Sequence, residues 1–297
     1  MAALLIRFIV WCISLLPLGI SRQLGKWMGC FLSQFDFETT RVTRINVQRC
    51  FPALTDLEHD NLVLKSLQHT AMLVMEFGML WYWSLERCRT LWQSVDGYNL
   101  VEGALQEKRG VLILVPHFGN WEVLSLHLGK SGYTCLYDRP RIAGLEKVIV
   151  DARSRTGGRL VPIGTAGIKT IVKALRNGEI VALLPDQVPD ANAGVYAPLF
   201  GHPALTMTLA QRLLKLSGAV PMLGAAVRTE RGFTICYQNV PEEVGNADSV
   251  VAATALNQMT ETLIRKDPAQ YQWEYRRFKR QPVGVSPVYP RKTRDDL

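Results

Sequence analysis

The chain has 297 residues and a mass of 33.3 kDa, enough for one large domain or two small ones with a hydrophobic core. Apolar residues make up 48% and charged residues 20%, which excludes wholesale disorder, and the mean hydropathy of +0.05 is too low for many membrane spans. The net charge of +8 resides at the two ends, because residues 1–50 carry +4, residues 265–297 carry +5 and the middle carries −1. No nucleic-acid recognition motif accompanies this charge, so an anionic membrane surface or an acidic carrier protein is the expected partner.

The six cysteines are widely spaced along the chain. No two of them lie closer than 18 residues, so the sequence has no CxxC pair and no compact zinc-binding spacing. This pattern is typical of a reduced, cytosol-facing chain without a disulfide framework. We expect neither a metal nor a cofactor.

A long apolar segment begins the chain. Residues 2–20 read AALLIRFIVWCISLLPLGI, with Arg7 as the only charge, and as a helix they would extend about 28 Å, near the hydrocarbon thickness of a bilayer. No small-x-small cleavage site precedes a polar start, so residues 1–24 are predicted to be an uncleaved membrane anchor, with a buried core helix as the alternative. Pro17 and Gly19 favour a bent end or a segment lying in the membrane interface, and the sequence leaves open whether the segment spans. Basic residues after it would hold the body on the cytoplasmic side (Arg22, Lys26, Arg41, Arg44 and Arg49).

Residues 25–104 are predicted to form a helical region. The stretch 38–95 has few Gly or Pro residues after Pro52, and residues 66–92 are apolar on more than one face and rich in Met and Trp. Two interpretations of residues 66–92 remain open. They form either a buried helix pair, or the wall of an acyl-chain groove or a membrane-facing surface.

From residue 105 the pattern changes to alternating strands and helices, which predicts an α/β core over residues 105–281. Strands are expected at residues 111–115, 133–137, 159–163, 179–184, 219–228 and 232–238, and helices at 122–130, 145–154, 168–177, 206–217 and 250–266. The predicted fold class is therefore α/β, with a mixed, mostly parallel central sheet flanked by helices and an N-terminal hydrophobic membrane helix. Residues 282–297 are expected to be a flexible tail.

Polar side chains follow three of the predicted strands where each strand ends. His117 follows the run VLILVP. Asp138 and Arg139 end the next strand, and Asp186 and Gln187 follow the run IVALLP. In open α/β sheets the ligand crevice lies outside the carboxyl ends of the strands, so these three clusters should converge on one cleft. This convergence is the main reason to expect an enzyme.

The first cluster has the sequence HFGNWE. Glu122 opens the following helix, and the intervening turn can bring its carboxylate back to one imidazole nitrogen of His117, which would fix the tautomer and leave the other nitrogen as a base. Gly119 lets the backbone approach closely, and free N–H groups at the helix start can bind a developing oxyanion. The alternatives are a core histidine beside a helix-start glutamate, and a metal site, for which a third ligand with a recognisable spacing is missing.

The second cluster is basic. Arginine is suited to bidentate phosphate binding, although each of these residues could also be a solvated surface charge. Arg153 and Arg155 are the better candidates, because they lie near a helix end that leads back to the sheet. The cluster consists of Arg139, Arg141, Arg153, Arg155 and Arg159. No G-x-S-x-G elbow occurs and no Cys lies beside a His, so we expect direct attack by an acceptor hydroxyl with His117 as base.

Six motifs in order resemble those of one family. They are HFGNWE at 117–122, DRP at 138–140, Arg155 nine residues before Gly164, PDQ at 185–187, FGHPALT at 200–206 and DPAQYQWEYRRFKRQP at 267–282. The chain resembles the bacterial lipid A biosynthesis lauroyl/myristoyl acyltransferases, a branch of the lysophospholipid-acyltransferase-like superfamily. The resemblance extends from the N-terminal apolar segment to about residue 282.

The resemblance implies an activity and its partners. Such enzymes move a fatty acyl chain from a thioester, usually of acyl carrier protein, to a hydroxyl of a lipid A precursor at the cytoplasmic face of the bacterial inner membrane. It implies His117 as general base with Glu122 as its partner. The residues expected to bind substrate are Arg155, Asp186, Arg139, Gly119, Asn120 and Gln187. One departure is Tyr275, which stands where the family usually has His before two arginines, and this points to a different acceptor lipid.

Other functions remain open at this stage. Within the enzyme class, the acceptor could be another lipid, the donor could be acyl-CoA, or water could replace the acceptor and give a thioesterase. From another class, the chain could be an inactive membrane-bound lipid-binding or scaffold protein. The intact HFGNWE motif argues against the last of these.

Overall fold

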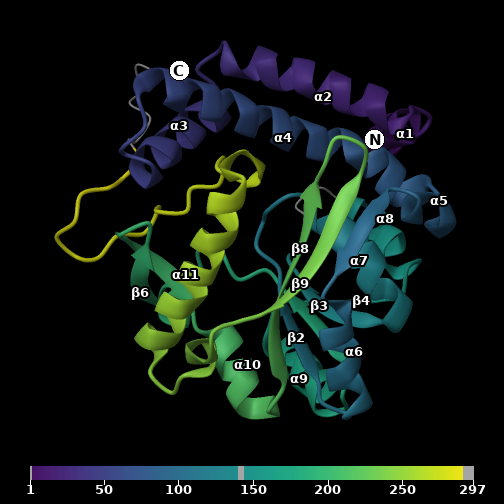
Figure 1. The fold of residues 1–297 in the computed structure, drawn as a ribbon, viewed down its shortest axis with the longest axis vertical. Helices are drawn as coiled ribbons and strands as arrows, with labels where there is room; N and C mark the ends of the chain where they lie inside the picture. Colours follow the sequence, from purple (N-terminus) through teal and green to yellow (C-terminus); the bar gives the residue numbers. More distant parts are fainter. Residues whose placement is uncertain (1, 140–143, 290–297) are drawn as a thin grey trace.

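A seven-stranded sheet forms the centre of the molecule. The computed structural model describes residues 2–139 and 144–289, and its sheet has the strand order β1-β9-β8-β2-β5-β3-β4 (Figure 1). The strands of this sheet are β1 (Trp92–Asp96), β2 (Val111–Leu114), β3 (Tyr133–Tyr137), β4 (Gly158–Pro162), β5 (Ile180–Leu183), β8 (Val220–Arg228) and β9 (Phe233–Asn239). Neighbouring strands run parallel except β8 and β9, so the predicted mixed, mostly parallel sheet is confirmed.

Helices cover both faces of this sheet. They include α6 (Tyr98–Gln106), α7 (Trp121–Leu128), α8 (Leu145–Ser154), α9 (Thr165–Arg176) and α10 (Leu209–Ser217). Alternate side chains of β2 enter two different hydrophobic clusters. Leu112 and Leu114 belong to the cluster that contains α9 and α10, whereas Val111 and Ile113 belong to the one that contains α6 and α7. Burial on both faces is the reason that this strand is apolar at every position.

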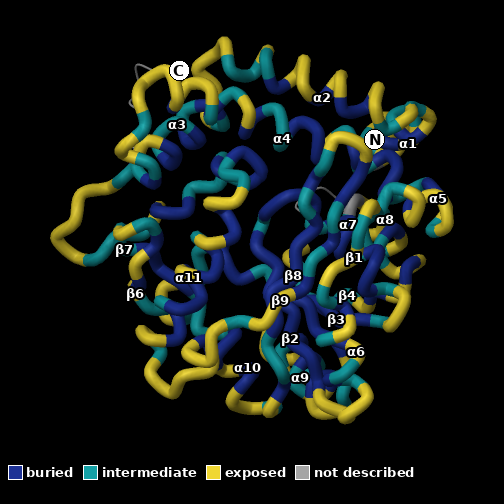
Figure 2. Tube along the Cα trace, in the orientation of Figure 1, coloured by how far each residue is buried: buried dark blue, intermediate teal, exposed yellow. Residues whose placement is uncertain are grey.

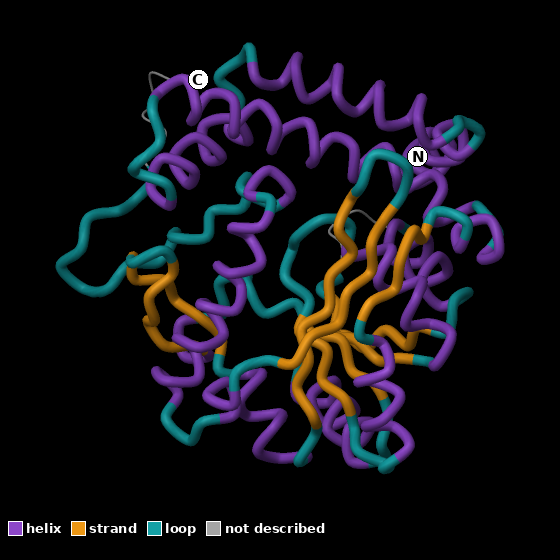
Figure 3. Tube along the Cα trace, in the orientation of Figure 1, coloured by secondary structure: helices purple, strands orange, loops and turns teal. Residues whose placement is uncertain are grey.

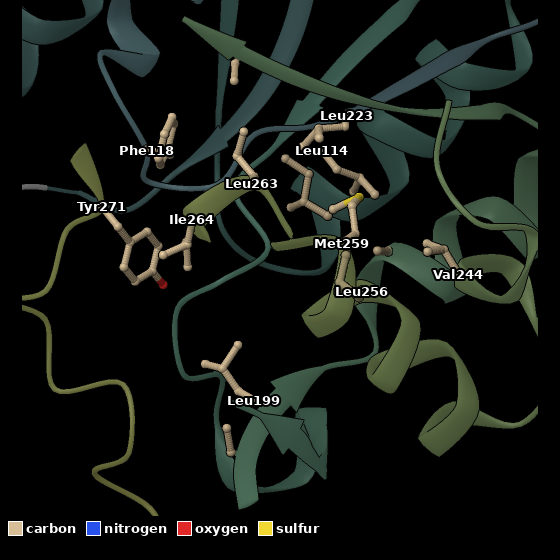
Figure 4. Packing of buried hydrophobic residues seen from close by; sticks show 14 of the residues in the cluster. Leu114, Phe118, Leu199, Leu223, Val244, Leu256, Met259, Leu263, Ile264 and Tyr271 are labelled. Carbon is tan, nitrogen blue, oxygen red and sulfur yellow. The ribbon is translucent and has the colours of Figure 1, made fainter. Parts of the chain in front are cut away.

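A further layer consists of α11 (Ser249–Lys266) and a separate two-stranded hairpin. The hairpin strands β6 (Gly194–Leu199) and β7 (His202–Met207) pair antiparallel and lie beside α11 (Figure 3). Figure 4 shows Leu256, Met259 and Leu263 of α11 in one cluster with Leu114 and Leu223 of the sheet. This layer therefore packs on the α9–α10 side of the sheet.

A helical layer lies against the other end of the molecule. It consists of α1 (Ala2–Ser14), α2 (Leu18–Ser33), α3 (Glu38–Cys50) and α4 (Asp56–Tyr82), followed by the short α5 (Leu85–Arg89). Figure 1 shows α2 running along α4. A Cβ atom on Gly25 would lie 2.7 Å from the Cα of Met72, and one on Gly29 would lie 2.4 Å from the Cα of Gln68. Glycine at these two positions is therefore what allows the two helix backbones to approach so closely.

The outer face of α1 and α2 is apolar and exposed (Figure 2). Of the twenty-three exposed large apolar side chains in the described residues, thirteen lie between residues 4 and 37. These thirteen form what we call the N-terminal apolar surface: Leu4, Leu5, Phe8, Ile9, Trp11, Leu15, Ile20, Leu24, Trp27, Met28, Phe31, Phe35 and Phe37. An apolar area of this extent marks an interaction surface rather than ordinary solvent-facing protein.

The N-terminal segment is not one continuous helix. α1 ends at Ser14, and α2 begins after Pro17, whose ring removes the N–H that would continue the first helix. α1 has 13 residues, which corresponds to about 20 Å. In the described part of the chain, no helix has both the length and the apolar character needed to cross a membrane. The segment therefore bends at the proline that predicted a bend, and the predicted N-terminal membrane helix is not confirmed.

Other differences from the sequence-based expectation are local. Residues 92–96 form strand β1 at the edge of the sheet beside β9, although helix was predicted to residue 95. Residues 206 and 207 belong to β7 rather than to the following helix, because they pair with residues 194 and 195 of β6. The flexible tail predicted from residue 282 is anchored as far as Tyr289, whose buried hydroxyl donates to Asn46 and accepts from the N–H of Phe278. Residues 290–297 lie outside the described residues.

Candidate active site

His117 and Asp186 meet because two neighbouring strands end alike. β2 and β5 pair in parallel register with Leu114 opposite Leu183, and each strand is followed by an apolar residue, a proline and then the polar residue. Equal numbers of residues after a registered pair place the two side chains next to each other. The N–H of His117 donates to Asp186 Oδ2 at 2.8 Å, and His117 Nδ1 lies 2.8 Å from Asp186 Oδ1. The predicted convergence of the strand ends is therefore seen for these residues.

The hydrogen bonds around the imidazole define its tautomer. Asp186 is buried, and burial alone would raise the pKa of its carboxyl, but the charge of His117 and two hydrogen bonds from that residue hold the pKa below its ordinary value. An ionised Asp186 accepts a hydrogen bond from Nδ1–H of the neutral imidazole, so Nε2 is left with its lone pair. The side-chain amide of Gln187 donates to Nε2 at 3.1 Å. The free nitrogen of His117 is thus oriented and able to accept a proton.

A cleft of about 910 Å³ opens in front of this nitrogen. His117, Gln187 and Asp138 contribute to its wall, so all three strand-end clusters reach it. The cleft extends to both sides of the sheet edge. Side chains from the α6–α7 cluster that line it include Leu124, Leu128, Tyr133 and Cys135, and those from the α9–α10 cluster include Leu136, Leu183, Met207 and Leu209. A mostly apolar cleft with a few converging polar groups is the usual form of a small-molecule or lipid site.

No thiolate is available in this cleft among the described residues. Cys135 is its cysteine, and burial raises the pKa of that thiol to about 11. A neutral thiol is a weak nucleophile at neutral pH. The described residues also contain no group of three His, Cys, Asp or Glu side chains placed to bind a metal.

Glu122 lies in the wall of the same cleft, but its partner is Arg153 and not His117. Arg153 donates through both Nε, at 3.1 Å, and Nη2 to the two carboxylate oxygens, and the charge of Glu122 raises the pKa of Arg153. The predicted hydrogen bond between Glu122 and the imidazole is replaced by this bidentate pair. The reason is topological: Glu122 is the second residue of α7 and faces α8, whereas Asp186 already occupies Nδ1.

The turn between His117 and α7 is held by backbone contacts. Gly119 has φ +63°, and a Cβ there would lie 2.1 Å from the carbonyl oxygen of Ala226, so glycine is required. Its N–H donates to the carbonyl of Gln270, and that of Asn120 donates to the carbonyl of Ala226. The predicted free donors at the helix start are also occupied, because the Asn120 side chain accepts the N–H groups of Glu122 and Val123.

Of the six predicted substrate-binding residues, only Gln187 lines the cleft, and Gly119 and Asp186 lie behind it in the contacts described above. The other three have different partners. Asn120 is fully buried. Arg155 donates from Nη1 to the carbonyl of Trp83 at 2.6 Å and from Nη2 to that of Leu80, and so caps the last turn of α4. Arg139 has a 69% exposed side chain and pairs with Glu146 of α8 at 3.4 Å. Arg141 lies outside the described residues.

Tyr275 supports the loop that carries Gln187. Its hydroxyl accepts the N–H of Val188 at 3.0 Å, and the carbonyl of Tyr275 accepts the side-chain amide of Asn46. The N–H of Gln272, nearby on the same segment, donates to the carbonyl of His117 at 3.0 Å. The C-terminal motif is therefore fastened to both strand-end loops of the cleft.

One polar cluster was not predicted from the sequence at all. Glu76 of α4 is completely buried and binds Arg22, Arg228 and Asn120. These four residues are separated by up to 206 positions in the chain, and each alone resembles an ordinary polar residue on an amphipathic element. The only signal in the sequence is an acidic residue within the otherwise apolar stretch AMLVMEFGMLW at residues 71–81.

The other histidines have structural partners. His59 and His202 contact backbone carbonyls through Nε2. His127 contacts the hydroxyl of Tyr237, and burial lowers its pKa to about 4. None of these three side chains lines the cleft.

An α/β sheet with a carboxylate-oriented histidine at its carboxyl edge, open to a large apolar cleft, is an arrangement that enzymes with acid–base chemistry use. The family described as "Bacterial lipid A biosynthesis acyltransferase" matches residues 1–280. The chain therefore belongs to the bacterial lipid A biosynthesis acyltransferase family, and it is an acyltransferase.

Curated relatives agree with this family. The chain is 29% identical over 294 residues to the lipid A biosynthesis lauroyltransferase of Escherichia coli (strain K12), a match that covers 95% of this chain and 92% of that protein. It is 30% identical over 285 residues to the lipid A biosynthesis palmitoleoyltransferase of the same organism, with the same coverage. The lipid A biosynthesis myristoyltransferase of that organism is 23% identical over 271 residues, covering 89% of this chain and 83% of the relative.

Proposed function

We propose that this enzyme transfers a fatty acyl chain from the thioester of acyl carrier protein to a hydroxyl of a lipid A precursor, with His117 as the general base. The observation that carries the proposal is the lone pair on Nε2 of His117, oriented through Nδ1 by Asp186 and facing a largely apolar cleft of about 910 Å³. The relatives named above act on lipid A, which supports this acceptor.

The proposed chemistry needs no covalent enzyme intermediate. Nε2 of His117 takes the proton of the acceptor hydroxyl as its oxygen attacks the thioester carbonyl carbon. The tetrahedral intermediate collapses by breaking the carbon–sulfur bond, and the departing sulfur takes the proton back from the imidazolium. The products are an ester and a free thiol. Asp186 stabilises the imidazolium that exists between the two proton transfers.

Gln187 and Arg153 are the donors available to the developing negative charge. The Gln187 amide occupies Nε2 now and must move when the acceptor hydroxyl arrives, which leaves it next to the reacting carbonyl. Glu122 acts through Arg153, which it holds in the cleft wall by two hydrogen bonds. Glu122 therefore stays in the proposed machinery, as the anion that fixes a guanidinium.

The acyl chain fits the closed side of the cleft. Leu124, Leu128 and Cys135 line that side and are each no more than 6% exposed. A saturated chain gains free energy from leaving water for such walls, about 0.8 kcal/mol for each buried CH₂. The polar headgroup of the acceptor then remains toward the open side, where Arg212 and Asp190 are exposed.

Membrane association is part of the proposal. The N-terminal apolar surface would lie in the interface of an anionic bilayer. The basic ends of the chain lie near it, because Arg276 pairs with Glu38 of α3 at 3.0 Å and so brings the C-terminal segment to the helical layer. We infer that the enzyme acts at the cytoplasmic face of the bacterial inner membrane, where a cytosolic carrier protein and a membrane lipid meet.

The activity is tested with purified enzyme, a lipid A precursor, and either acyl carrier protein or coenzyme A carrying the same acyl chain. We expect the product to gain the mass of one fatty acid minus one water, with the carrier protein as the better donor. His117→Ala should lower transfer by at least about 10²–10⁴-fold. His202→Ala is the matched control and should keep activity, because His202 binds a backbone carbonyl away from the cleft.

Two results would contradict the proposed function. Release of free fatty acid with no gain in mass of the lipid would make the protein a thioesterase. Full transfer by folded His117→Ala would show that His117 is not the general base.

Membrane binding is tested by flotation with vesicles that contain anionic lipid. The double variant Trp27→Glu and Phe31→Glu, on the exposed face of α2, should lose most vesicle binding. Leu57→Glu is the control, because Leu57 is 79% exposed but lies outside the N-terminal apolar surface. Equal binding by all three proteins would contradict the proposed membrane face.

A further inference from the structure

Glu76 is the centre of a buried polar cluster next to the active site. Its two carboxylate oxygens accept from Arg228 Nε and Nη2 at 2.9–3.0 Å, from Arg22 Nε at 2.8 Å and from Asn120 Nδ2 at 2.7 Å. Arg228 also contacts His69 at 3.2 Å. Burial and the charge of Arg228 lower the pKa of His69 to about 3, so this histidine stays neutral. The carboxylate therefore faces two cations and one neutral amide.

Asn120 connects this cluster to the catalytic turn. Its Oδ1 caps α7 by accepting the N–H groups of Glu122 and Val123, while its Nδ2 donates to Glu76. Asn120 stands three residues after His117 and two before Glu122, the residues that bring the imidazole and the Glu122–Arg153 pair to the cleft. Fixing the Asn120 side chain therefore fixes both ends of the turn.

Arg22 connects the same carboxylate to α2. Its remaining N–H groups donate to the carbonyls of Thr229 and Gly232 at 2.6 and 3.0 Å, at the tip of the β8–β9 hairpin. Arg22, Gly25 and Gly29 lie on the face of α2 that meets α4, and the opposite face carries part of the N-terminal apolar surface. α2 thus touches the exterior on one side and the Glu76 cluster on the other.

We propose that Glu76 is a positioning residue for the catalytic turn and that α2, through Arg22, sets the place of Glu76. The chain of contacts runs from α2 through Arg22 and Glu76 to Asn120, and Asn120 holds the turn between His117 and Glu122. The active-site geometry then depends on α2 being seated against α4. This inference rests on the proposed role of His117 as base.

A purely stabilising role would not require Asn120. Arg228 alone contacts both oxygens of Glu76, so the carboxylate is paired without the amide. α7 is capped by Oδ1 alone, so its cap does not require Nδ2. The ion pair and the helix cap are therefore complete without the bond between Asn120 and Glu76. What this bond adds is a fixed orientation of the turn.

Asn120→Ser is the sharpest test, because serine keeps the helix cap and removes only the donor to Glu76. We expect kcat to fall roughly 10- to 100-fold with KM for the acyl donor unchanged, since a displaced base slows the chemical step rather than binding. Hydrogen exchange should accelerate at the N–H groups of Gly119 and Asn120, which are bonded to Gln270 and Ala226.

Asp248→Ala is the matched control for lost stability. Asp248 caps α11 in the same way, by accepting the N–H groups of Val250 and Val251. The 18 residues of α11 separate it from Gln270, which contacts the catalytic turn. This variant loses its whole helix cap, so it should lose at least as much thermal stability as Asn120→Ser while keeping wild-type kcat. If kcat falls in both variants in proportion to their loss of Tm, the Asn120 effect is only structural and the proposal is overturned.

Arg22→Met tests the link to α2. Glu76 stays paired with Arg228 in this variant, so the carboxylate is not left alone. We expect faster exchange in the turn at residues 117–122, which Arg22 does not contact, together with a fall in kcat. Unchanged exchange in the turn of both Asn120→Ser and Arg22→Met overturns the inference. The exchange measurement tests the link between α2 and the turn even if the wild-type enzyme transfers no acyl chain. Absence of transfer by the wild type would refute the proposed function instead.

Discussion

Two buried carboxylates, Glu76 and Asp186, lie on either side of the same catalytic turn and have different roles. Glu76 has its oxygens occupied by Arg22, Arg228 and Asn120 and is completely enclosed. Asp186 binds the N–H and Nδ1 of His117, and the other ring nitrogen of that histidine faces the cleft. The fully hydrogen-bonded Glu76 cluster holds the structure in place. The Asp186 cluster includes a ring nitrogen that faces the cleft and can accept a proton.

The two carboxyls also differ in the kind of partner that lowers their pKa. Burial would raise the pKa of both carboxyls, and in both cases the partners outweigh it and the pKa is lowered. For Glu76 the partners are two permanent cations, Arg228 and Arg22. For Asp186 the partner is His117, whose charge changes during the reaction proposed above. Only the second arrangement can respond to a proton transfer.

The largest effect is expected from Glu76→Ala. Removal of the carboxylate leaves two guanidinium groups buried without an anion, and breaking a buried pair in this way costs about 3–5 kcal/mol. Denaturant unfolding should show a loss of that size, and activity should be lost with the fold. A change in unfolding free energy of less than about 1 kcal/mol would mean that water or other groups already solvate the arginines.

Asp186→Asn should separate activity from stability. The amide has the shape of the carboxylate but no charge, so it neither holds the Nδ1–H tautomer as firmly nor stabilises the imidazolium. We expect kcat/KM to fall by roughly 10²-fold or more, which is about 3 kcal/mol of transition-state stabilisation. The Tm should change much less than in Glu76→Ala. Wild-type activity in this variant would show that the imidazole needs no anionic partner.

Glu122→Gln should have a smaller effect on catalysis. The change weakens the hold on Arg153 but does not touch the imidazole, so we expect roughly a 10-fold loss in kcat/KM with the pH–rate profile of the wild type. Measured pH profiles of this variant and of Asp186→Asn provide the comparison. A shifted profile for Glu122→Gln would restore the direct partnership with His117 that the HFGNWE spacing first suggested.

The smallest effect is on the acid dependence of stability. A carboxyl whose folded pKa is lowered contributes stability that is present above its unfolded pKa of about 4 and is lost as the pH falls through the folded value. Glu76 and Asp186 both have lowered pKa values, so the unfolding free energy should decline below about pH 4. In Asp186→Asn this decline should be shallower. An identical slope in both proteins would show that Asp186 is not preferentially ionised in the folded state.

The sheet and its polar edge could be predicted because they depend on local patterns. The runs before His117 and Asp186 are uninterrupted apolar stretches ending in proline, and both became adjacent parallel strands in register. A strand period and a shared edge are enough to expect that these two residues reach the same cleft, although the spacing predicted Glu122 as the partner of the imidazole. Gln187 followed from the same reasoning, since it is the next residue along.

The partners of the other motif residues could not be predicted in this way. Glu122 was expected at His117 because the two are close in sequence, yet it meets Arg153, 31 residues away on α8. Arg155 looks like a phosphate-binding residue but caps α4, and Asn120 looks like a cleft residue but is buried against Glu76. These contacts depend on the relative rotation of packed helices, which no local spacing records.

The sequence by itself determined six of the seven strands of the central sheet, the apolar character of the N-terminal segment and the position of the imidazole at the sheet edge. These features follow from side-chain periodicity and from backbone limits such as the missing N–H of Pro17, which act within a few residues. Tertiary structure alone decided which acid each base meets, because a buried charge takes whichever partner the packing brings within hydrogen-bond distance, and that distance is set by elements far apart in the chain.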